Sequence, residues 1–282
     1  MTTATTTSGR STLRPHTVQP ATFRRLVAGE WIKLRSLRST WWVLALGVLL
    51  VPAFAASRMV SIAQVPEAVG SESLVGAVYV TSGVALSQLA FAVLGVLAIT
   101  GEYGSGQIRT TLTVAPARLA AIAAKLLVTV GLVVAASAVA VALAWAVSSV
   151  WFEETGMSID LTRAEDARIV LGAPLYLGAV TALAFGLGAL VRSSAAGISI
   201  VVGLLLVVEN LLAVIPWSPI QDAAAYLPSS AGSRLLLFEA AGSVVTASDS
   251  TLLTPWAGYG VMLLWVVAVL ALAGTLLRRR DA

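Results

Sequence analysis

The chain has 282 residues, of which 58% are hydrophobic and only 11% are charged, and its formal net charge is +4. This composition excludes an ordinary soluble domain and indicates an integral membrane protein. The absence of cysteine excludes disulfides, thiol catalysis and thiolate metal sites. Nucleic acid is not an expected partner, because the basic residues fall where membrane topology would place them.

Long uncharged runs predict six membrane-spanning helices, because a helix needs about 20 apolar residues to cross the hydrocarbon core. The alternating pattern of a membrane β-barrel is absent from the sequence. The predicted fold class is therefore an all-α integral membrane protein with six transmembrane helices. The predicted spans cover about residues 41–59, 75–100, 126–151, 169–191, 196–215 and 257–277.

Lysine and arginine are concentrated on one side of these spans. Residues 1–40 hold seven of them, residues 101–125 hold three, the turn near 192 holds one and the C-terminal tail holds three. The positive-inside rule then places both termini in the cytoplasm. The opposite side holds only Arg58, Arg163, Arg168 and Arg234.

The N-terminal part divides into two segments. Residues 1–22 are rich in Thr and Ser, lack apolar periodicity and predict a disordered cytoplasmic tail. Helical spacing of apolar residues over 23–40 predicts an interfacial amphipathic helix on the inner leaflet, with Trp31 on its apolar side. A stop-transfer charge cluster before the first span is the alternative. The other faces of this segment carry Arg24, Arg25, Lys33, Arg35 and Arg38, and the arginines are expected near anionic headgroups.

The first span contains Pro52 and the sequence AFAAS at 53–57, which imitates a signal-peptidase site. Cleavage there is a less favoured alternative, because the basic region that precedes the span is longer than that of a signal peptide.

Two later spans carry small residues four apart, a spacing that lets another helix approach closely. We expect these ridges to be packing surfaces rather than ligand sites, and one or more of the spans to form a homodimer seam. The ridges are Ala136, Ala140, Ala144 and Ser148 in the third span, and Gly178, Ala182 and Gly186 in the fourth. The short turn that follows makes the fourth and fifth spans antiparallel neighbours.

Residues 216–256, between the fifth and sixth spans, predict an outer loop with re-entrant helices. The segment is too polar in places to cross the bilayer and too apolar for a plain linker. Trp217, Tyr226 and Trp256 are placed as interfacial anchors, and a short helix is expected over 231–241.

The residues needed for most membrane enzymes are missing. The only histidine, His16, lies in the predicted tail, which excludes histidine-based catalysis or metal binding within the bilayer. The sequence also lacks the GxxxxGK[ST] loop that cradles phosphates. We therefore expect no enzymatic activity and no cofactor or metal on this chain.

Glu209, beside Asn210, is the one carboxylate inside a predicted span, and both are candidate pathway residues. A role in proton coupling or substrate contact is one interpretation. The other is structural, because Glu209 lies near the outer interface, where it can reach water or bond Asn210.

The polar stretch Gly101–Lys125, GEYGSGQIRTTLTVAPARLAAIAAK, separates the second and third spans. Gly104 and Gly106 permit a tight turn, Pro116 ends a short helix, and Arg118 and Lys125 are expected to tether the third span to the inner headgroups. An ordinary inner loop positioned by charge is the alternative.

This stretch resembles the permease subunits of ABC-2 type exporters, in which a Glu–Tyr pair ends span 2 and an IRTTL-like run, a Pro, an Arg and a Lys follow. The segment Glu30–Trp42 and the six-span layout are also similar, so the resemblance covers about residues 23–280. The matching residues are Glu102, Tyr103, Gly106, Ile108, Arg109, Thr110, Leu112, Pro116, Arg118 and Lys125.

The resemblance implies a permease subunit of an exporter in the bacterial cytoplasmic (inner) membrane. It also implies a second copy of the chain or a related permease, surrounding membrane lipid, and a separate ABC ATPase that binds ATP and Mg. A coupling helix in this stretch would dock into a groove of the ATPase. The implied coupling residues are Glu102, Tyr103, Gly104, Gly106, Gln107, Ile108, Arg109, Thr110, Leu112, Pro116 and Arg118.

Two other classes of function stay open at this point: a non-transporting membrane anchor or sensor, and an ion-coupled secondary transporter that uses Glu209. The cargo stays open too. Spans of Val, Leu and Ala suit an amphipathic cargo and a lipid-facing surface equally well.

Overall fold

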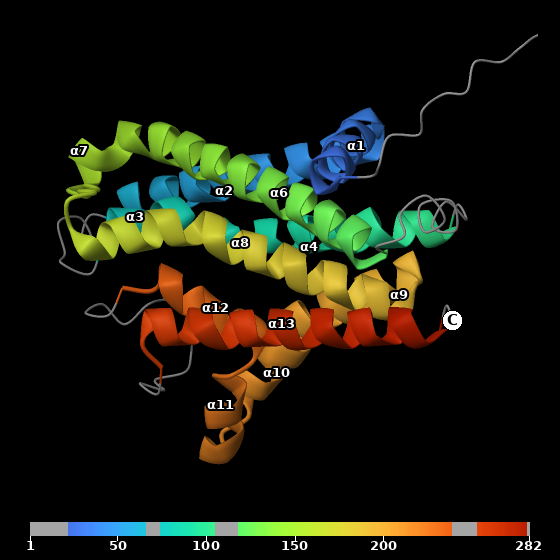
Figure 1. The fold of residues 1–282 in the computed structure, drawn as a ribbon. Coiled ribbons are helices and arrows are strands. Elements are labelled where there is room, and N and C mark those ends of the chain that lie inside the picture. Colours follow the sequence, from blue (N-terminus) through green and yellow to red (C-terminus); the bar gives the residue numbers. More distant parts are fainter. Residues whose placement is uncertain (1–21, 66–73, 105–117, 239–252, 281–282) are drawn as a thin grey trace, which may run out of the picture.

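The structure is a computed structural model that describes residues 22–65, 74–104, 118–238 and 253–280. All regular elements in these ranges are helices. Six helical segments are long and apolar enough to cross a membrane, which confirms the predicted six-span, multi-pass architecture (Figure 1). These segments are Arg38–Ala63, Gly76–Tyr103, Leu119–Thr155, Ala164–Val191, Ser194–Leu212 and Pro255–Leu277.

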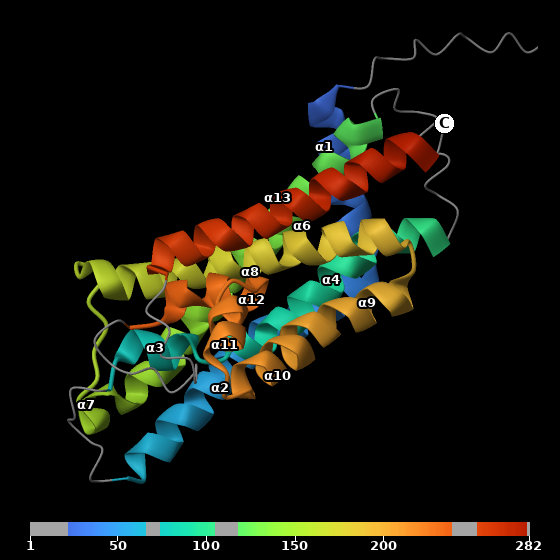
Figure 2. The ribbon, with the colours of Figure 1, turned by 90° about the horizontal axis from the view of Figure 1, so that it is seen from below.

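The central helix of the bundle is α8 (Ala164–Val191), and nearly all of its apolar stretch is buried. It packs against α4 (Val84–Gly104), α6 (Arg118–Ser148) and α13 (Pro255–Arg280). The first span, α2 (Arg38–Ala63), covers α4 and α6 from the other side (Figure 2). An all-round apolar sequence suits the central position, because a helix without a polar face can be buried on every side.

The two ends of the bundle are different. The helix α1 (Phe23–Ser36) packs across α6 close to the end at which α13 finishes. At the opposite end lie α3 (Gly76–Thr81) and α7 (Phe152–Thr155), which follows the short helix η1 (Ser149–Trp151). We refer to these as the α1 end and the α7 end.

The helix expected over 23–40 is divided into two helices. Leu37 adopts an extended conformation with φ −86° and ψ 115°, which ends α1 at Ser36. Arg38 is therefore the first residue of α2 rather than part of the amphipathic helix. This break turns the chain from the direction of α1 into that of the first span.

The second span is interrupted at Ser82 and Gly83, between α3 and α4. A Cβ atom built on Gly83 would lie 2.6 Å from Cα of Val51, so a side chain there would collide with the backbone of α2. Glycine is needed at this position because the two backbones approach so closely.

The fifth span is also irregular, in place of the single helix expected over 196–215. It consists of α9 (Ser194–Val202), the π-helix η2 (Gly203–Val208) and α10 (Glu209–Val214). A π-helical turn rotates the residues that follow it relative to an α-helix. The side chains of Glu209 and Asn210 consequently face different surroundings from those of an unbroken helix.

Short helices follow the fifth span and return the chain to the bundle: α11 (Ser218–Ala224), α12 (Pro228–Gly232) and η3 (Ser233–Leu236). The helix predicted over 231–241 thus begins earlier, and residues 239–241 lie outside the described part. In Figure 1, α10 and α11 extend away from the bundle, whereas α12 packs against α13.

The small-residue ridges are confirmed as packing surfaces, but the partners are helices of the same chain. A Cβ atom on Gly178 would lie 2.7 Å from Cγ2 of Val134 in α6, and one on Gly186 would lie 2.8 Å from Cγ1 of Val269 in α13. The expected homodimer seam stays a prediction, but these ridges do not provide it, because α6, α8 and α13 of the same chain cover them. The ridge members Ala136, Ala140, Ala144, Ser148 and Ala182 are all buried.

The closest approach of α4 to α8 occurs at Gly95, where an added Cβ would lie 2.5 Å from the carbonyl oxygen of Thr181. We expect Gly95→Ala to lower the free energy of unfolding by about 1–3 kcal/mol, because the added methyl group can be accommodated only if the backbone of α8 shifts. Gly131→Ala is the matched control, since a Cβ on Gly131 meets no described atom within 4 Å. Thermal unfolding of the detergent-solubilised variants measures the difference, and equal stability of the two would contradict the close packing.

Candidate functional site

The structure describes only the two ends of the predicted coupling stretch. Glu102, Tyr103 and Gly104 are the last three residues of α4, and Arg118 is the first residue of α6. The helices therefore reach further into the stretch than predicted, and Lys125 lies two turns inside α6. The remaining predicted coupling residues, Gly106, Gln107, Ile108, Arg109, Thr110, Leu112 and Pro116, lie outside the described residues.

Four charged side chains from three helices meet at the α1 end, and we call Glu30, Lys33, Glu102 and Lys125 the charge cluster. Lys125 forms ion pairs with both carboxylates, and its Nζ atom lies 2.9 Å from Oε1 of Glu102. Lys33 pairs with the same oxygen of Glu102. The cluster thus joins α1 to the end of α4 and to the start of α6.

The charge cluster is buried and electrically balanced. The side chains of Glu102 and Lys125 are 6% and 7% exposed, that of Glu30 is 11% exposed, and only Lys33 retains substantial exposure, at 32%. Two positive and two negative charges compensate one another, as buried charges require. The predicted tethering of Lys125 to the lipid headgroups is therefore wrong, because its amine is buried between Glu30 and Glu102.

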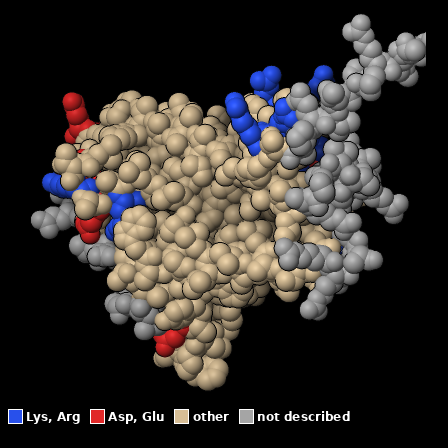
Figure 3. All heavy atoms as spheres, viewed as in Figure 1, with Lys and Arg blue, Asp and Glu red and all other residues tan. Residues whose placement is uncertain are grey.

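On the other face of α1, the exposure of the arginines fits the predicted interfacial helix. Arg24, Arg25 and Arg35 are exposed, as is Arg38 at the start of α2. Trp31 is 43% exposed, and Figure 3 shows basic side chains gathered over this helix. The apolar side predicted for α1 is split, since Leu34 is buried against the bundle while Phe23 and Trp31 stay exposed.

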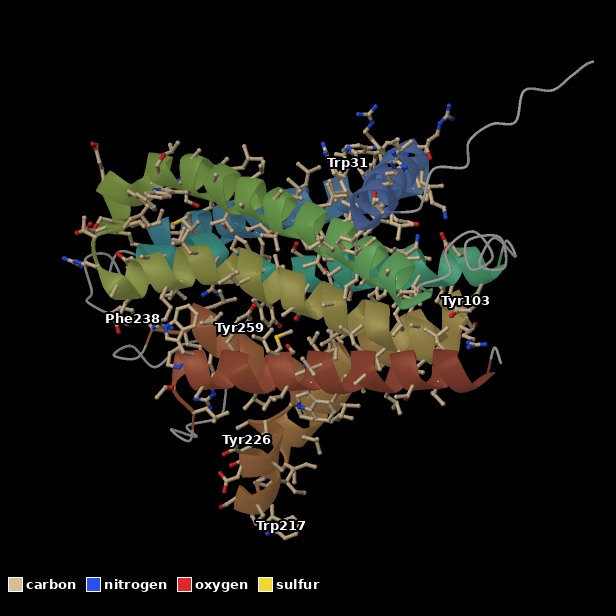
Figure 4. All side chains as sticks on the ribbon, viewed as in Figure 1. Trp31, Tyr103, Trp217, Tyr226, Phe238 and Tyr259 are labelled. Atoms are coloured by element: carbon tan, nitrogen blue, oxygen red, sulfur yellow. The ribbon has the colours of Figure 1, made fainter. Side chains whose placement is uncertain are left out.

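Tyr103 adds a further connection at the same end of the bundle (Figure 4). The guanidinium carbon of Arg192 lies 5.3 Å from the centre of the Tyr103 ring, within the range of a cation–π interaction. Arg192 adopts a left-handed conformation with φ 58° at the turn between α8 and α9. One turn earlier, Thr100 accepts a hydrogen bond of 2.8 Å from Ser194 of α9. The last turn of α4 is thus connected to α1, to α6 and to the turn between α8 and α9.

A second group of polar side chains lies deep in the bundle, and we call Gln88, Tyr176, Glu209 and Ser229 the core polar cluster. The Tyr176 hydroxyl donates to Oε1 of Gln88 and lies 2.8 Å from the Ser229 hydroxyl. All four residues are less than 10% exposed. They come from α4, α8, α10 and α12, so this cluster fixes α12 inside the bundle.

Glu209 is held by the first residues of α12. Its Oε1 accepts a hydrogen bond of 2.9 Å from the Ser229 backbone N–H, and its Oε2 accepts from the backbone N–H and the hydroxyl of Ser230, at 2.7 and 2.8 Å. Each of these groups is a donor, which suits an ionised carboxylate.

The Glu209–Asn210 hydrogen bond, which the sequence offered as one alternative to contact with water, is not formed in the described structure. The Asn210 amide instead donates to the Leu206 carbonyl of its own helix, at 2.7 Å, and its side chain faces outward. Neighbouring residues of a helix do not face each other, so Glu209 is buried against α12 while Asn210 is exposed. Asn210 therefore has no contact with the core polar cluster.

No model of a known protein family matches the sequence, and no curated protein matches it. Function must therefore be inferred from the two clusters and from the membrane architecture. Within the described ranges, no group of three or more His, Asp or Glu side chains could hold a metal ion.

Sequence reasoning missed four members of the two clusters: Glu30 as an ion-pair partner, and Gln88, Tyr176 and Ser229 as members of a polar group. The first three carried a detectable signal. Glu30 lies at helical spacing from Leu26, Val27 and Leu34 on the inward face of α1, where a lone carboxylate would need a buried cation. Gln88 and Tyr176 are hydrogen-bonding side chains inside apolar spans, where such groups seek one another.

Proposed function

We propose that the chain is the permease subunit of an ATP-binding cassette exporter, with ATP hydrolysed on a separate ABC ATPase. The observation that carries the proposal is the charge cluster. It makes one buried unit of α1, the end of α4 and the start of α6, at the point where the coupling stretch leaves the bundle. A push on that stretch would move these helices together.

The cation–π contact supports the same function. Through Tyr103 and Arg192, movement of the last turn of α4 also reaches the turn between α8 and α9. Four of the spans therefore share connections at the α1 end, whereas an ordinary loop positioned by charge alone needs none. The resemblance of Glu102–Lys125 to ABC-2 permeases is the reason for proposing an ABC ATPase as the docking partner.

We further propose that the α1 end faces the cytoplasm of a bacterial cell and that α1 lies at the inner membrane surface. Its exposed arginines would lie among anionic headgroups. The C-terminal Arg278, Arg279 and Arg280 end α13 at the same end of the bundle. A second copy of the chain or a related permease would complete the pathway.

Site-specific crosslinking tests the proposal, because the chain has no cysteine of its own. Gly101→Cys places a thiol on an exposed position of α4, where a Cβ atom meets no described atom within 4 Å. After modification with a photoreactive maleimide in native membranes, we expect an adduct with an ABC ATPase, identified by mass spectrometry.

Arg163→Cys is the matched control, because the Arg163 side chain is 74% exposed in the loop before α8, at the α7 end. A membrane-impermeant maleimide applied to intact cells should label this cysteine but not the one at 101, and no ATPase adduct should form at 163. The proposal fails if the adduct at 101 lacks an ATPase or if the sidedness is reversed. An adduct with another kind of protein would favour the anchor or sensor function.

The ion-coupled transporter has no comparable support. Both carboxylate oxygens of Glu209 are occupied by donors of α12, so its role in the described structure is to hold a helix.

A further inference from the structure

One face of the fifth span is exposed along the second half of the helix. Glu209 holds the opposite face of α10 to α12, and Leu205 before it is also buried. In Figure 1, α10 and α11 extend away from the bundle, and Figure 4 shows Trp217 at the far tip of this arm. The exposed residues, which we call the span-5 face, are Leu206, Val207, Asn210, Leu211 and Val214.

Asn210, the only asparagine of the chain, lies in the middle of this apolar face. Leu206 and Val214, one turn to either side, are 49% and 77% exposed. The Asn210 amide donates to the Leu206 carbonyl at 2.7 Å, so it is directed back into the span and not towards its end.

This single hydrogen bond leaves the amide incomplete. A primary amide has two N–H donors and one acceptor oxygen. In the described part of the chain, the Asn210 side chain bonds only Leu206, so its oxygen and its second N–H face outward. Lipid tails offer no hydrogen bond, and polar groups of this kind pair with another helix in a membrane.

The amide distinguishes the span-5 face from an ordinary lipid-facing surface. The helices α2, α6 and α13 also expose large apolar side chains, for example Leu49, Val139 and Leu264. These three helices contain neither asparagine nor glutamine. Lipid tails satisfy such apolar faces completely, whereas the span-5 face needs a partner with both a donor and an acceptor.

We propose that the span-5 face is the interface between two copies of this chain, with the two Asn210 amides paired across a two-fold axis. A two-fold axis brings the same residue of both copies together. The oxygen of each amide then accepts from the amide nitrogen of the other, which satisfies both outward groups at once. The face carries no charge, so the two copies do not repel each other. This inference specifies the second copy that is part of the proposed function.

Disulfide crosslinking of single-cysteine variants tests the interface, because the chain has no cysteine of its own. In native membranes treated with copper phenanthroline, we expect Leu211→Cys and Val214→Cys to form disulfide-linked homodimers. Such a bond requires two Cα atoms within about 7 Å. Val139→Cys is the matched control, since Val139 is 55% exposed on α6, away from the α10 arm (Figure 1). This variant should remain monomeric.

Substitution of Asn210 tests the amide pair itself. Asn210→Leu keeps the approximate size of the side chain but removes the amide, and should raise the dissociation constant of the dimer about tenfold. Energy transfer between fluorophores on Arg163→Cys, recorded in proteoliposomes at increasing lipid dilution, measures this constant. Asn210→Gln retains a self-complementary amide and should restore most of the association. Both variants should fold, because the Asn210 side chain bonds only its own helix.

The proposal is overturned if the α10 cysteines form no more homodimer than Val139→Cys, or if they link the chain to a different protein. It is also overturned if Asn210→Leu associates as strongly as the native chain. Association of the two copies requires no ATPase, so its outcome is separate from that of the Gly101→Cys adduct. A homodimer without the ATPase adduct would overturn the exporter function and keep this interface, and the reverse result would overturn the interface alone.

Discussion

Replacement of Lys125 by Met is expected to lower the free energy of unfolding by about 3–5 kcal/mol, because it leaves buried charge without compensation. Lys125 is the only residue of the charge cluster that pairs with both Glu30 and Glu102. Without it, the buried Glu30 carboxylate loses its ion-pair partner in the charge cluster, and Glu102 keeps only Lys33. Thermal unfolding of the purified protein in detergent measures the loss.

Lys33→Met is the matched control, since it removes the same charge from the same cluster. Its side chain is 32% exposed and pairs only with Glu102, which keeps Lys125. We expect a loss of about 1 kcal/mol, in the range of solvent-exposed pairs. Equal effects of the two substitutions would contradict the described burial.

A second substitution shows whether the stability loss of Lys125→Met comes from unpaired charge or from altered packing. In the Lys125→Met background, Glu30→Gln removes the carboxylate that has lost its ion-pair partner and should recover part of the stability. If Glu30→Gln instead lowers the free energy of unfolding as much in this background as it does in the native chain, the defect of Lys125→Met comes from altered packing and not from unpaired charge.

The charge cluster also joins α1 to the bundle. A simple amphipathic helix on a membrane surface would slide over the headgroups when the bundle moves. Here, Glu30 and Lys33 fix one face of α1 to α6 and α4, while its arginines remain outside. In the proposed exporter, α1 would therefore move with the coupling stretch relative to the inner leaflet.

The six spans could be predicted from the sequence because crossing a membrane imposes a length and an apolar composition on each segment. Local departures were not predictable in this way. The break at Gly83 depends on the close approach of α2, and the π-helix before Glu209 has no residue pattern that distinguishes Gly203–Val208 from an α-helix.

Part of the charge cluster was recognised from the sequence, but its pairing was not. Glu102 and Lys125 were recognised as chemically important, and both were assigned to a surface loop. Their actual partners are 69 to 95 positions away along the chain. Charge counting by loops, which gave the orientation, treats every lysine as exposed, and so it places Lys125 at the headgroups when the residue is in fact buried.

Glu209→Ala is expected to lower the free energy of unfolding by about 2–4 kcal/mol and to loosen α12, because each orphaned buried donor costs about 1–3 kcal/mol. The substitution leaves the backbone N–H groups of Ser229 and Ser230 without their acceptor. Hydrogen exchange of the amides from Ser229 to Leu236 should then accelerate, while exchange in α8 changes little.

Asn210→Ala provides the control one residue away, since its side chain is exposed and bonds only its own helix. It should alter stability by less than about 0.5 kcal/mol and leave exchange in α12 unchanged. Glu209→Gln should lie between the two, because one acceptor oxygen remains while the new amide opposes a donor of Ser230 or Ser229. If α12 keeps its protection in Glu209→Ala, the carboxylate does not hold this helix. Its burial would then have to be explained by a role in the pathway itself.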